Sequence, residues 1–76
     1  MINSNIKMIP VQSSNVKSVG YDEDNGNVHI EFASGERYAY MGVPKKVYED
    51  LLIAKSIGAY INRHLKKSYE AIPQKS

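Results

Sequence analysis

The stretch Phe32–Tyr48, FASGERYAYMGVPKKVY, decides the fold of this chain. It predicts the end of one strand, a tight turn, a second strand and the start of a helix at Pro44, because proline suits the first helical position. Residues before this stretch favour strands, and residues after it favour helices. We therefore expect the chain to change here from a sheet layer to a helical layer.

The length and charge of the chain limit what it can be. Its 76 residues suffice for one domain with one core. The net charge is +2, which by itself indicates no partner. The charge is unevenly placed: residues 16–43 hold two basic and five acidic side chains, a net −3, and residues 44–69 hold six basic and two acidic, a net +4. The helical half is thus expected to be cationic.

Several classes of protein are disfavoured by composition. The chain has no cysteine, which excludes disulfides, thiolate zinc sites and thiol nucleophiles, and fits a reducing compartment. Its apolar runs are far shorter than the ~20 residues that span a bilayer. We find no nucleophile beside a base, no Walker-type loop and no dinucleotide-binding glycine pattern. We expect a cytoplasmic, non-catalytic protein without membrane contact, metal or cofactor.

Two hairpins are predicted in the sheet layer. In the first, Asn25-Gly26 favours a two-residue turn, which sets Tyr21 opposite Ile30 and Val19 opposite Phe32. In the second, a three-residue loop Ala33-Ser34-Gly35 places glycine at the position that needs a positive φ. That loop sets Ile30 opposite Tyr38, Val28 opposite Tyr40 and Glu31 opposite Arg37, an oppositely charged pair on the other face.

Two helices should follow. Beyond Pro44, the first carries an apolar stripe, and Ser56 is expected to cap the second. The stripes comprise Val47, Tyr48, Leu51, Leu52 and Ala54 in the first helix, and Ile57, Tyr60, Ile61, His64 and Leu65 in the second. The predicted fold is α+β: a three-stranded antiparallel meander packed against two C-terminal helices in two layers. Residues 1–15 form an arm or short edge segment, residues 16–70 the domain, and residues 71–76 a frayed tail.

The order of short motifs resembles a known family, the KTSC domain, named for its place at the C-terminus of some lysyl-tRNA synthetases. The resemblance covers roughly Val11 to Tyr69. It implies a small bacterial or phage-encoded domain for which RNA or nucleic-acid binding is the usual suggestion. The motifs that carry it are Val11-x-Ser-Ser, Val19-Gly-Tyr-Asp, Phe32-x-Ser-Gly, Tyr38-x-Tyr, Val43-Pro, Tyr48, Ala54-x-Ser-x-Gly, Tyr60, Asn62 and Tyr69.

Candidate binding residues are aromatic and basic. Tyr38 and Tyr40 point the same way along a strand, as base-stacking pairs do, although their register also suits core packing with hydroxyls at the rim. Lys45 and Lys46 lie in the first turn of a helix, a place where phosphate binds well but where exposed lysines also cost little. The remaining candidates form either a phosphate-tracking strip or a solvated helix face. They are Lys55, Arg63, Lys66 and Lys67.

Other polar residues favour structural roles. His29 is expected on the outer sheet face and His64 on the apolar stripe, too far apart to share a metal. The acidic run Asp22, Glu23 and Asp24 lacks the spacing of a calcium loop and is expected to be a solvated turn.

Two functions remain open. The first is a small nucleic-acid-binding module, with RNA or another single strand as partner, that uses the residues above. The alternative is a protein-binding adaptor or inhibitor, such as a phage-encoded protein that docks on a host machine, or a homo-oligomer. Its contact surface would be the outer sheet face, assumed to be exposed, with the N-terminal arm. That face carries His29, Glu31, Arg37, Ala39 and Met41.

Overall fold

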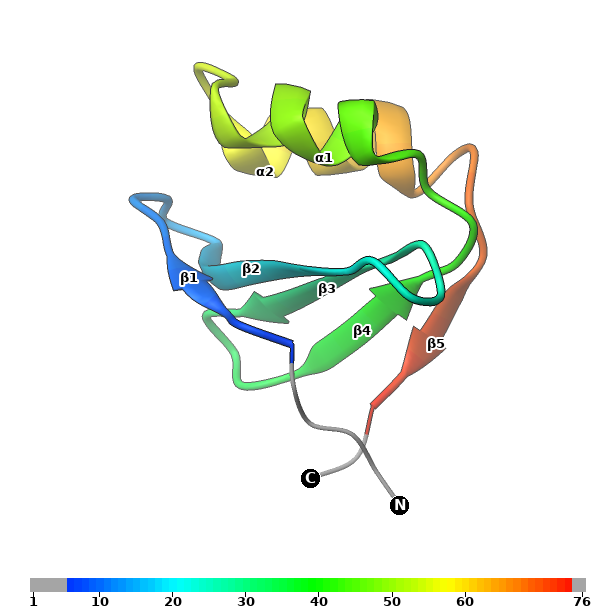
Figure 1. The fold of residues 1–76 in the computed structure, drawn as a ribbon. Helices are drawn as coiled ribbons and strands as arrows, with labels where there is room; N and C mark the ends of the chain where they lie inside the picture. Colours follow the sequence, from blue (N-terminus) through cyan, green and yellow to red (C-terminus); the bar gives the residue numbers. More distant parts are fainter. Residues whose placement is uncertain (1–5, 75–76) are drawn as a thin grey trace.

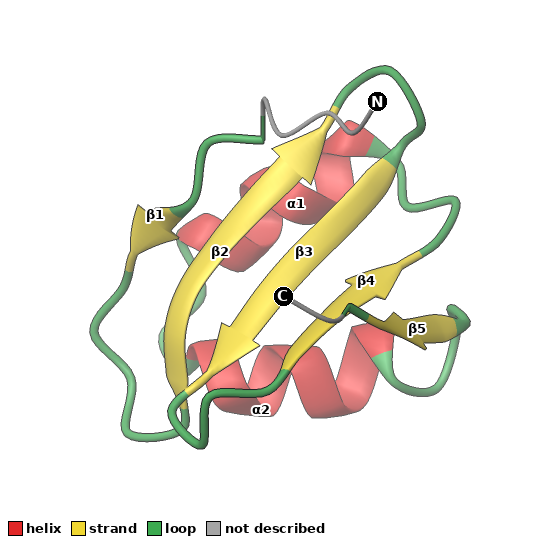
Figure 2. Cartoon of the chain, turned by 90° about the horizontal axis from the view of Figure 1, so that it is seen from below, coloured by secondary structure: helices red, strands yellow, loops and turns green. Residues whose placement is uncertain are grey.

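The computed structural model describes residues 6–74 and shows a five-stranded antiparallel sheet with two helical segments on one face (Figure 1). The strands follow the chain order across the sheet, with the helices behind it in Figure 2. The α+β, two-layer prediction is confirmed, although the sheet has two more strands than expected. The elements are β1 Ile9–Pro10, β2 Val16–Asp22, β3 Asn27–Phe32, β4 Arg37–Tyr40, α1 Lys45–Leu52, α2 Ile57–Tyr60, a π-helical turn Ile61–Leu65, and β5 Ala71–Pro73.

The two additional strands are short and lie at the edges. β1 pairs with β2, and β5 pairs with β4. The prediction of a frayed tail is wrong for Ala71–Pro73, whose backbone pairs with β4, and the Gln74 N–H donates to the Arg37 carbonyl at 2.8 Å. After the helices the chain returns to the free edge of β4, where backbone N–H and C=O groups need hydrogen-bond partners. Short-range sequence patterns do not reveal this return. Residues 1–5 of the predicted arm and 75–76 of the tail lie outside the described residues.

The β3–β4 hairpin has the predicted register. Ile30 lies opposite Tyr38, Val28 opposite Tyr40, and Glu31 opposite Arg37. The Gly35 N–H donates to the Phe32 carbonyl at 2.9 Å, and Gly35 has a φ of 99°. Since that φ suits glycine alone, the local sequence was sufficient to fix this turn.

The predicted register of the β2–β3 hairpin is wrong by two residues. Tyr21 lies opposite Val28 and Val19 opposite Ile30. The connection is a longer turn, closed by a hydrogen bond from the Gly26 N–H to the Asp22 carbonyl at 2.8 Å, and only its glycine has a positive φ. A shift of two residues leaves every side chain on its predicted face.

The acidic run in that turn organises the turn itself. The Asp22 carboxylate accepts hydrogen bonds from the backbone N–H groups of Asp24 and Asn25 and from the Asn25 side chain at 2.8 Å. The Asn25 side-chain hydrogen bond is the main cause that holds the pKa of Asp22 below its usual range. The side chain thus satisfies turn N–H groups, as aspartate commonly does in turns.

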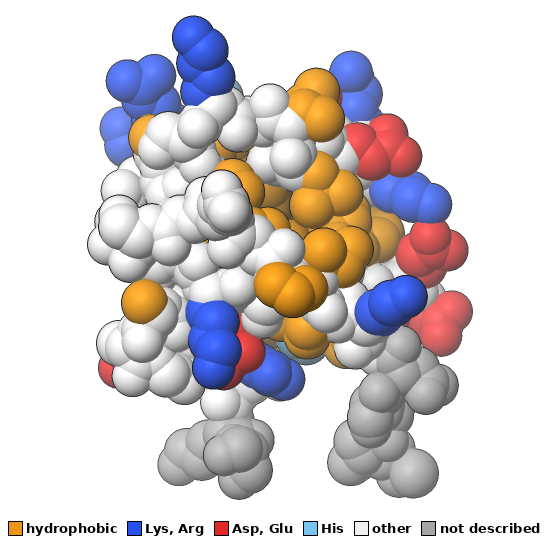
Figure 3. Space-filling model, turned by 90° about the vertical axis from the view of Figure 1, so that its left-hand side faces the viewer, with side chains coloured by type: hydrophobic (Ala, Val, Ile, Leu, Met, Phe, Trp, Pro, Cys, Tyr) orange, Lys and Arg blue, Asp and Glu red, His pale blue; other side chains and the backbone are white. Residues whose placement is uncertain are grey.

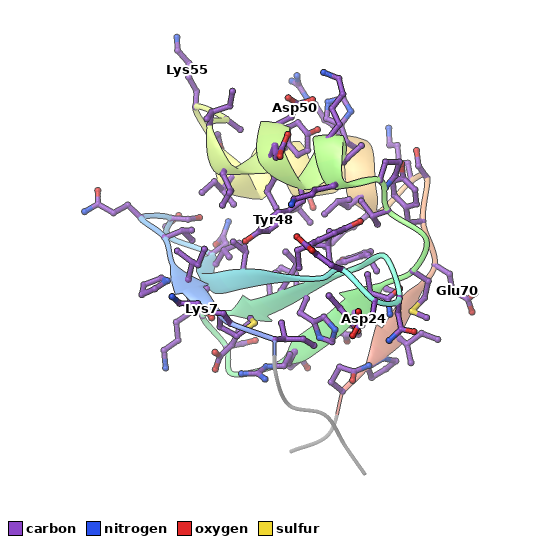
Figure 4. The ribbon with its side chains drawn as sticks, viewed as in Figure 1. Lys7, Asp24, Tyr48, Asp50, Lys55 and Glu70 are labelled. Atoms are coloured by element: carbon purple, nitrogen blue, oxygen red, sulfur yellow. The ribbon has the colours of Figure 1, made fainter. Side chains whose placement is uncertain are left out.

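The core lies between the sheet and the helices. The Tyr48 ring stacks on Tyr21 with centroids 5.3 Å apart, and Figure 4 shows Tyr48 between the two layers. The Tyr21 hydroxyl donates to the Val43 carbonyl at 2.7 Å, so its polar end is satisfied. The side chains with at most 1% exposure are Val16, Val19, Val28, Ile30, Val43, Leu51, Ile61 and Leu65.

The helix starts are close to the predictions. Pro44 has an extended ψ of 146° and caps α1, which begins at Lys45, so the predicted start is wrong by one residue. Ser56 caps α2 as predicted: its hydroxyl accepts the Ala59 N–H at 3.3 Å.

The second helix continues as a π-helical turn, in which the Lys66 N–H donates to the Ile61 carbonyl at 2.9 Å. This wider turn breaks the regular helical period assumed from the sequence. Ile57, Ile61 and Leu65 are buried, whereas His64 is exposed, and its ring lies 4.4 Å from the Tyr60 ring, centroid to centroid, at a tilt of 36°. The prediction that His64 lies on the buried stripe is therefore wrong.

The outer face of the sheet is more covered than expected. His29 and Ala39, predicted to be exposed there, are only 9% and 3% exposed. The segment 6–8 crosses β2 at Gly20, where an added Cβ would lie 2.8 Å from the Lys7 carbonyl oxygen and the Met8 sulfur. The missing side chain is what permits this close approach.

The burial of His29 predicts a pH effect on stability. Burial holds the pKa of His29 below its usual range; Asp22 opposes this shift and Arg37 adds to it. Below pH ~6.5 the unfolded chain takes up this proton more readily than the folded one, so stability falls as the pH drops toward the folded pKa. We expect His29→Gln to lose less stability than the unaltered protein between pH ~7.5 and ~5, measured by urea unfolding. Equal losses would contradict this origin of the pH dependence.

Candidate nucleic-acid interface

One hollow of the described residues, which we call the aromatic groove, has a volume of about 650 Å³. It lies where the β3–β4 hairpin meets the segment that follows the π-helical turn. Four of its lining residues are aromatic, one is a lysine and one a glutamate. The lining residues are Asn15, Phe32, Ala33, Ser34, Glu36, Tyr38, Tyr40, Lys66, Tyr69 and Ala71.

The aromatic residues of the groove differ in how much they show to solvent. Tyr38 and Tyr69 are half-buried, and Tyr38 meets Phe32 edge to face with centroids 6.0 Å apart. Tyr40 is only 2% exposed, and burial, followed by the nearby Tyr38, raises the pKa of its hydroxyl. Tyr40 thus contributes mainly to the wall, whereas Tyr38 and Tyr69 offer more accessible surface.

A cation lies at the same groove. The Lys66 ammonium is 5.7 Å from the centre of the Phe32 ring, within the range of a cation–π contact. The π-helical turn ends at Leu65, immediately before Lys66. An aromatic wall and a positive charge therefore line the same hollow.

Two smaller hollows follow the groove, and each shares lining residues with the one before it. The first, the polar hollow, has a volume of about 460 Å³ and shares Asn15 with the groove. Hydroxyl and amide side chains dominate its lining. It is lined by Gln12, Ser13, Ser14, Asn15, Lys55, Ser56, Ile57, Gly58, Ala59 and Asn62.

The second, the arginine hollow, has a volume of about 320 Å³ and shares Lys55, Ser56 and Ala59 with the polar hollow. Its remaining lining residues are Ala54, Tyr60, Arg63 and His64. The polar hollow therefore shares lining residues with both the groove and the arginine hollow, which share none with each other. We call the three together the track.

The structure divides the predicted basic residues into two groups. Lys66, Lys55 and Arg63 line the track, and Lys55 projects from the connection between α1 and α2 in Figure 4. Lys46 and Lys67 are exposed but line none of the three hollows. Figure 3 accordingly shows Lys and Arg at several separate places around the rim of one side of the molecule, not as one patch.

Lys45 lies outside the track and already has a partner. Its ammonium is 2.6 Å from the Glu23 carboxylate, and both side chains are exposed. The hydrogen bond from Lys45 to Glu23 is the main cause that raises the pKa of Lys45. The nearby carboxylate offsets the positive charge at the start of α1, so this end of the helix is a weaker phosphate site than its two lysines indicated.

Both predicted tyrosines, Tyr38 and Tyr40, line the groove, but the sequence did not identify all of its residues. The groove is also lined by Phe32, Ser34, Glu36 and Tyr69, for which the sequence predicted no site role. Phe32-x-Ser-Gly and Tyr69 were among the motifs that carried the family resemblance, which was the available signal. Phe32 and Tyr69 lie in the same groove because β3 and the segment after the π-helical turn come together in the fold. Local sequence patterns do not predict such a long-range contact.

Metal-binding clusters and membrane-spanning helices are both absent from residues 6–74. Within that range no three His, Asp or Glu side chains gather closely enough to hold a metal ion. No helix in the same range is long and apolar enough to cross a membrane. The two histidines lie in different settings, His29 buried on the outer sheet face and His64 exposed on the π-helical turn.

Comparison with solved structures shows the same fold in a crystallised relative. The crystal structure of a KTSC domain protein from Yersinia pestis superposes with a TM-score of 0.88 and is 30% identical in sequence. The superposition covers 92% of this chain and 99% of that one.

Comparison by sequence finds relatives of similar length and one much larger enzyme. An uncharacterized protein of Stutzerimonas stutzeri is 38% identical over 84% of this chain and 90% of its own length, and a protein of Tsukamurella paurometabola is 37% identical over 86% and 97%. A lysine–tRNA ligase of Nostoc punctiforme is 33% identical over 83% of this chain but only 11% of its own length. The family model of the KTSC domain matches residues 12–69. The chain belongs to the KTSC domain family.

Proposed function

We propose that this protein binds single-stranded nucleic acid, RNA in preference, along the track. The observation that carries the proposal is a succession of three hollows that share lining residues, each lined by a basic residue, with aromatic rings in the largest of the three. Aromatic faces for bases beside cations for phosphates are the usual elements of single-strand binding.

The basic residues of the track supply the charge for phosphate contact. Lys66, Lys55 and Arg63 line successive hollows, so a strand that follows the track meets a cation in each. Each neutralised phosphate of a single strand adds about −0.7 to the slope of log affinity against log salt. Three contacts therefore predict a slope of about −2.

The groove supplies the stacking surface. Tyr38 and Tyr69 are half-buried, so their rings are held by packing but remain accessible at the groove. A base stacked on an aromatic side chain gains about 1–3 kcal/mol. Paired bases in a duplex cannot enter a hollow of this kind, which is why an unpaired strand fits better.

The comparison with the ligase favours RNA. By its name, the Nostoc punctiforme relative acts on tRNA, and a segment similar to this chain forms part of it. Hydroxyl and amide side chains in the polar hollow also suit a 2′-hydroxyl, which both donates and accepts hydrogen bonds.

Fluorescence anisotropy with a labelled mixed-sequence RNA of about 10 nucleotides tests the proposal. We expect Lys66→Gln to weaken binding and to reduce the salt slope by about 0.7, because it removes one phosphate contact. Lys46→Gln removes the same charge from an exposed position off the track and serves as the matched control.

Two outcomes would contradict the proposal. If the two variants weakened binding equally, only net charge would matter and the track would have no role. If neither RNA nor single-stranded DNA bound the unaltered protein at about 50 mM salt, the proposed function itself would be wrong. Circular dichroism of each variant shows whether the fold is retained.

A further inference from the structure

The aromatic groove is lined by charges of opposite sign. Lys66 and Glu36 are both among its lining residues, and both are exposed. The backbone of Glu36 is held by the hairpin: its carbonyl accepts the Phe32 N–H at 2.8 Å, and its N–H donates to the Ser34 hydroxyl at 3.4 Å. In residues 6–74 the ion pairs join Arg37 to Glu31 and Lys45 to Glu23, so no described residue pairs with the Glu36 carboxylate.

A carboxylate in a phosphate-binding groove restricts what lies beside it. An ionised glutamate only accepts hydrogen bonds, and it repels phosphate. The part of a ligand near Glu36 must therefore be uncharged and rich in donors, whereas the phosphate belongs near Lys66.

The four bases differ in the donors that they offer to a carboxylate. Guanine presents two neighbouring donors, N1–H and the N2 amino group, on its Watson–Crick edge. Adenine and cytosine each present one amino group beside an acceptor nitrogen, and uracil one N–H between two acceptor carbonyls. Two parallel hydrogen bonds to both oxygens of a carboxylate are stronger and more specific than one. Guanine alone matches both oxygens of Glu36.

The contact between Lys66 and Phe32 argues against a different occupant. Aromatic hollows with a nearby carboxylate also hold cations such as lysine or arginine side chains of a peptide. Here the Lys66 ammonium already lies 5.7 Å from the Phe32 ring centre and would repel a second cation. The charges of the groove thus suit an anionic nucleotide with a donor-rich base.

We propose that the aromatic groove selects an unpaired guanine, whose N1–H and N2 amino groups donate to the Glu36 carboxylate while its phosphate lies at Lys66. The inference rests on the proposed function, because it names the base that the same groove would hold. Tyr38 and Tyr69 supply the surface on which the guanine ring stacks.

Anisotropy titrations with labelled oligouridine strands that carry one central guanine, adenine, cytosine or hypoxanthine test this selectivity. We expect the guanine strand to bind about tenfold more tightly than the adenine strand, as one bidentate pair provides. The hypoxanthine strand, which lacks the N2 amino group, should lie between them. Glu36→Gln should bring the guanine and adenine strands to within about threefold, because the amide has only one acceptor oxygen. Glu49→Gln, at an exposed site on α1 that does not line the groove, should keep the preference.

The results separate the two proposals. Equal binding of all four strands, or a guanine preference unchanged in Glu36→Gln, would overturn the base selectivity while leaving single-strand binding intact. Binding of none of the strands would overturn both. A preference lost in Glu36→Gln and kept in Glu49→Gln would support the guanine site.

Discussion

Leu51→Ala is expected to lower the free energy of unfolding by about 2–5 kcal/mol. Leu51 is fully buried between α1 and the sheet, so its removal loses apolar burial and leaves a cavity. Small domains bury a limited core and are only marginally stable, so a loss of this size approaches the whole stability of the protein. Urea unfolding followed by circular dichroism measures the change.

The next residue on the same helix provides the control. Leu52 is 38% exposed, so Leu52→Ala removes the same atoms from a position that is partly in water. We expect its cost to be a fraction of the cost at Leu51. If the two variants were equally destabilised, α1 would not pack against the sheet through the face that carries Tyr48 and Leu51.

Gly20→Ala is expected to destabilise the protein by about 1–3 kcal/mol, although alanine usually strengthens a strand relative to glycine. The added Cβ would lie 2.8 Å from the Lys7 carbonyl and the Met8 sulfur, and the carbonyl belongs to backbone that cannot simply rotate away. The segment 6–8 must then move off β2. Thermal unfolding measures the cost, and faster limited proteolysis before β1 reports the displacement.

Gly58→Ala tests the same change where there is room. An added Cβ there would lie 3.6 Å from the Asn15 side-chain nitrogen, an ordinary contact, and α2 gains up to ~1 kcal/mol from alanine. We expect this variant to be as stable as the unaltered protein or more so. Destabilisation of similar size at both glycines would show that the crossing at Gly20 is not the cause.

The second hairpin was predictable because its information is local. Gly35 must take a positive φ, and one loop length satisfied both faces of the strands. The first hairpin gave the wrong register because Asn-Gly is also compatible with a longer turn. The Asp22 carboxylate stabilises the longer turn. The alternation of apolar and polar residues along a strand does not show which of the two turns is more stable.

The features that the sequence missed depend on contacts between distant segments. Ala71–Pro73 becomes a strand only because the helices return the chain to the free edge of β4. His64 was predicted on the buried stripe because a regular α-helical period was assumed. The π-helical turn interrupts that period and leaves His64 exposed, and the sequence carries no signal for this turn. The groove combines Phe32 with Tyr69, residues that meet only after the sheet and helices pack. Two of its tyrosines, Tyr38 and Tyr40, were predicted because a short motif placed them on one strand.

Both outer strands carry a proline, Pro10 in β1 and Pro73 in β5. Proline has no N–H to donate, and each of these strands is only two or three residues long. A second copy of the protein therefore finds few free N–H and C=O groups at either edge with which to pair a further strand. Such edge-to-edge pairing is the step by which open sheets grow into fibrils. At high concentration the folded protein should resist amyloid-like growth from these borders.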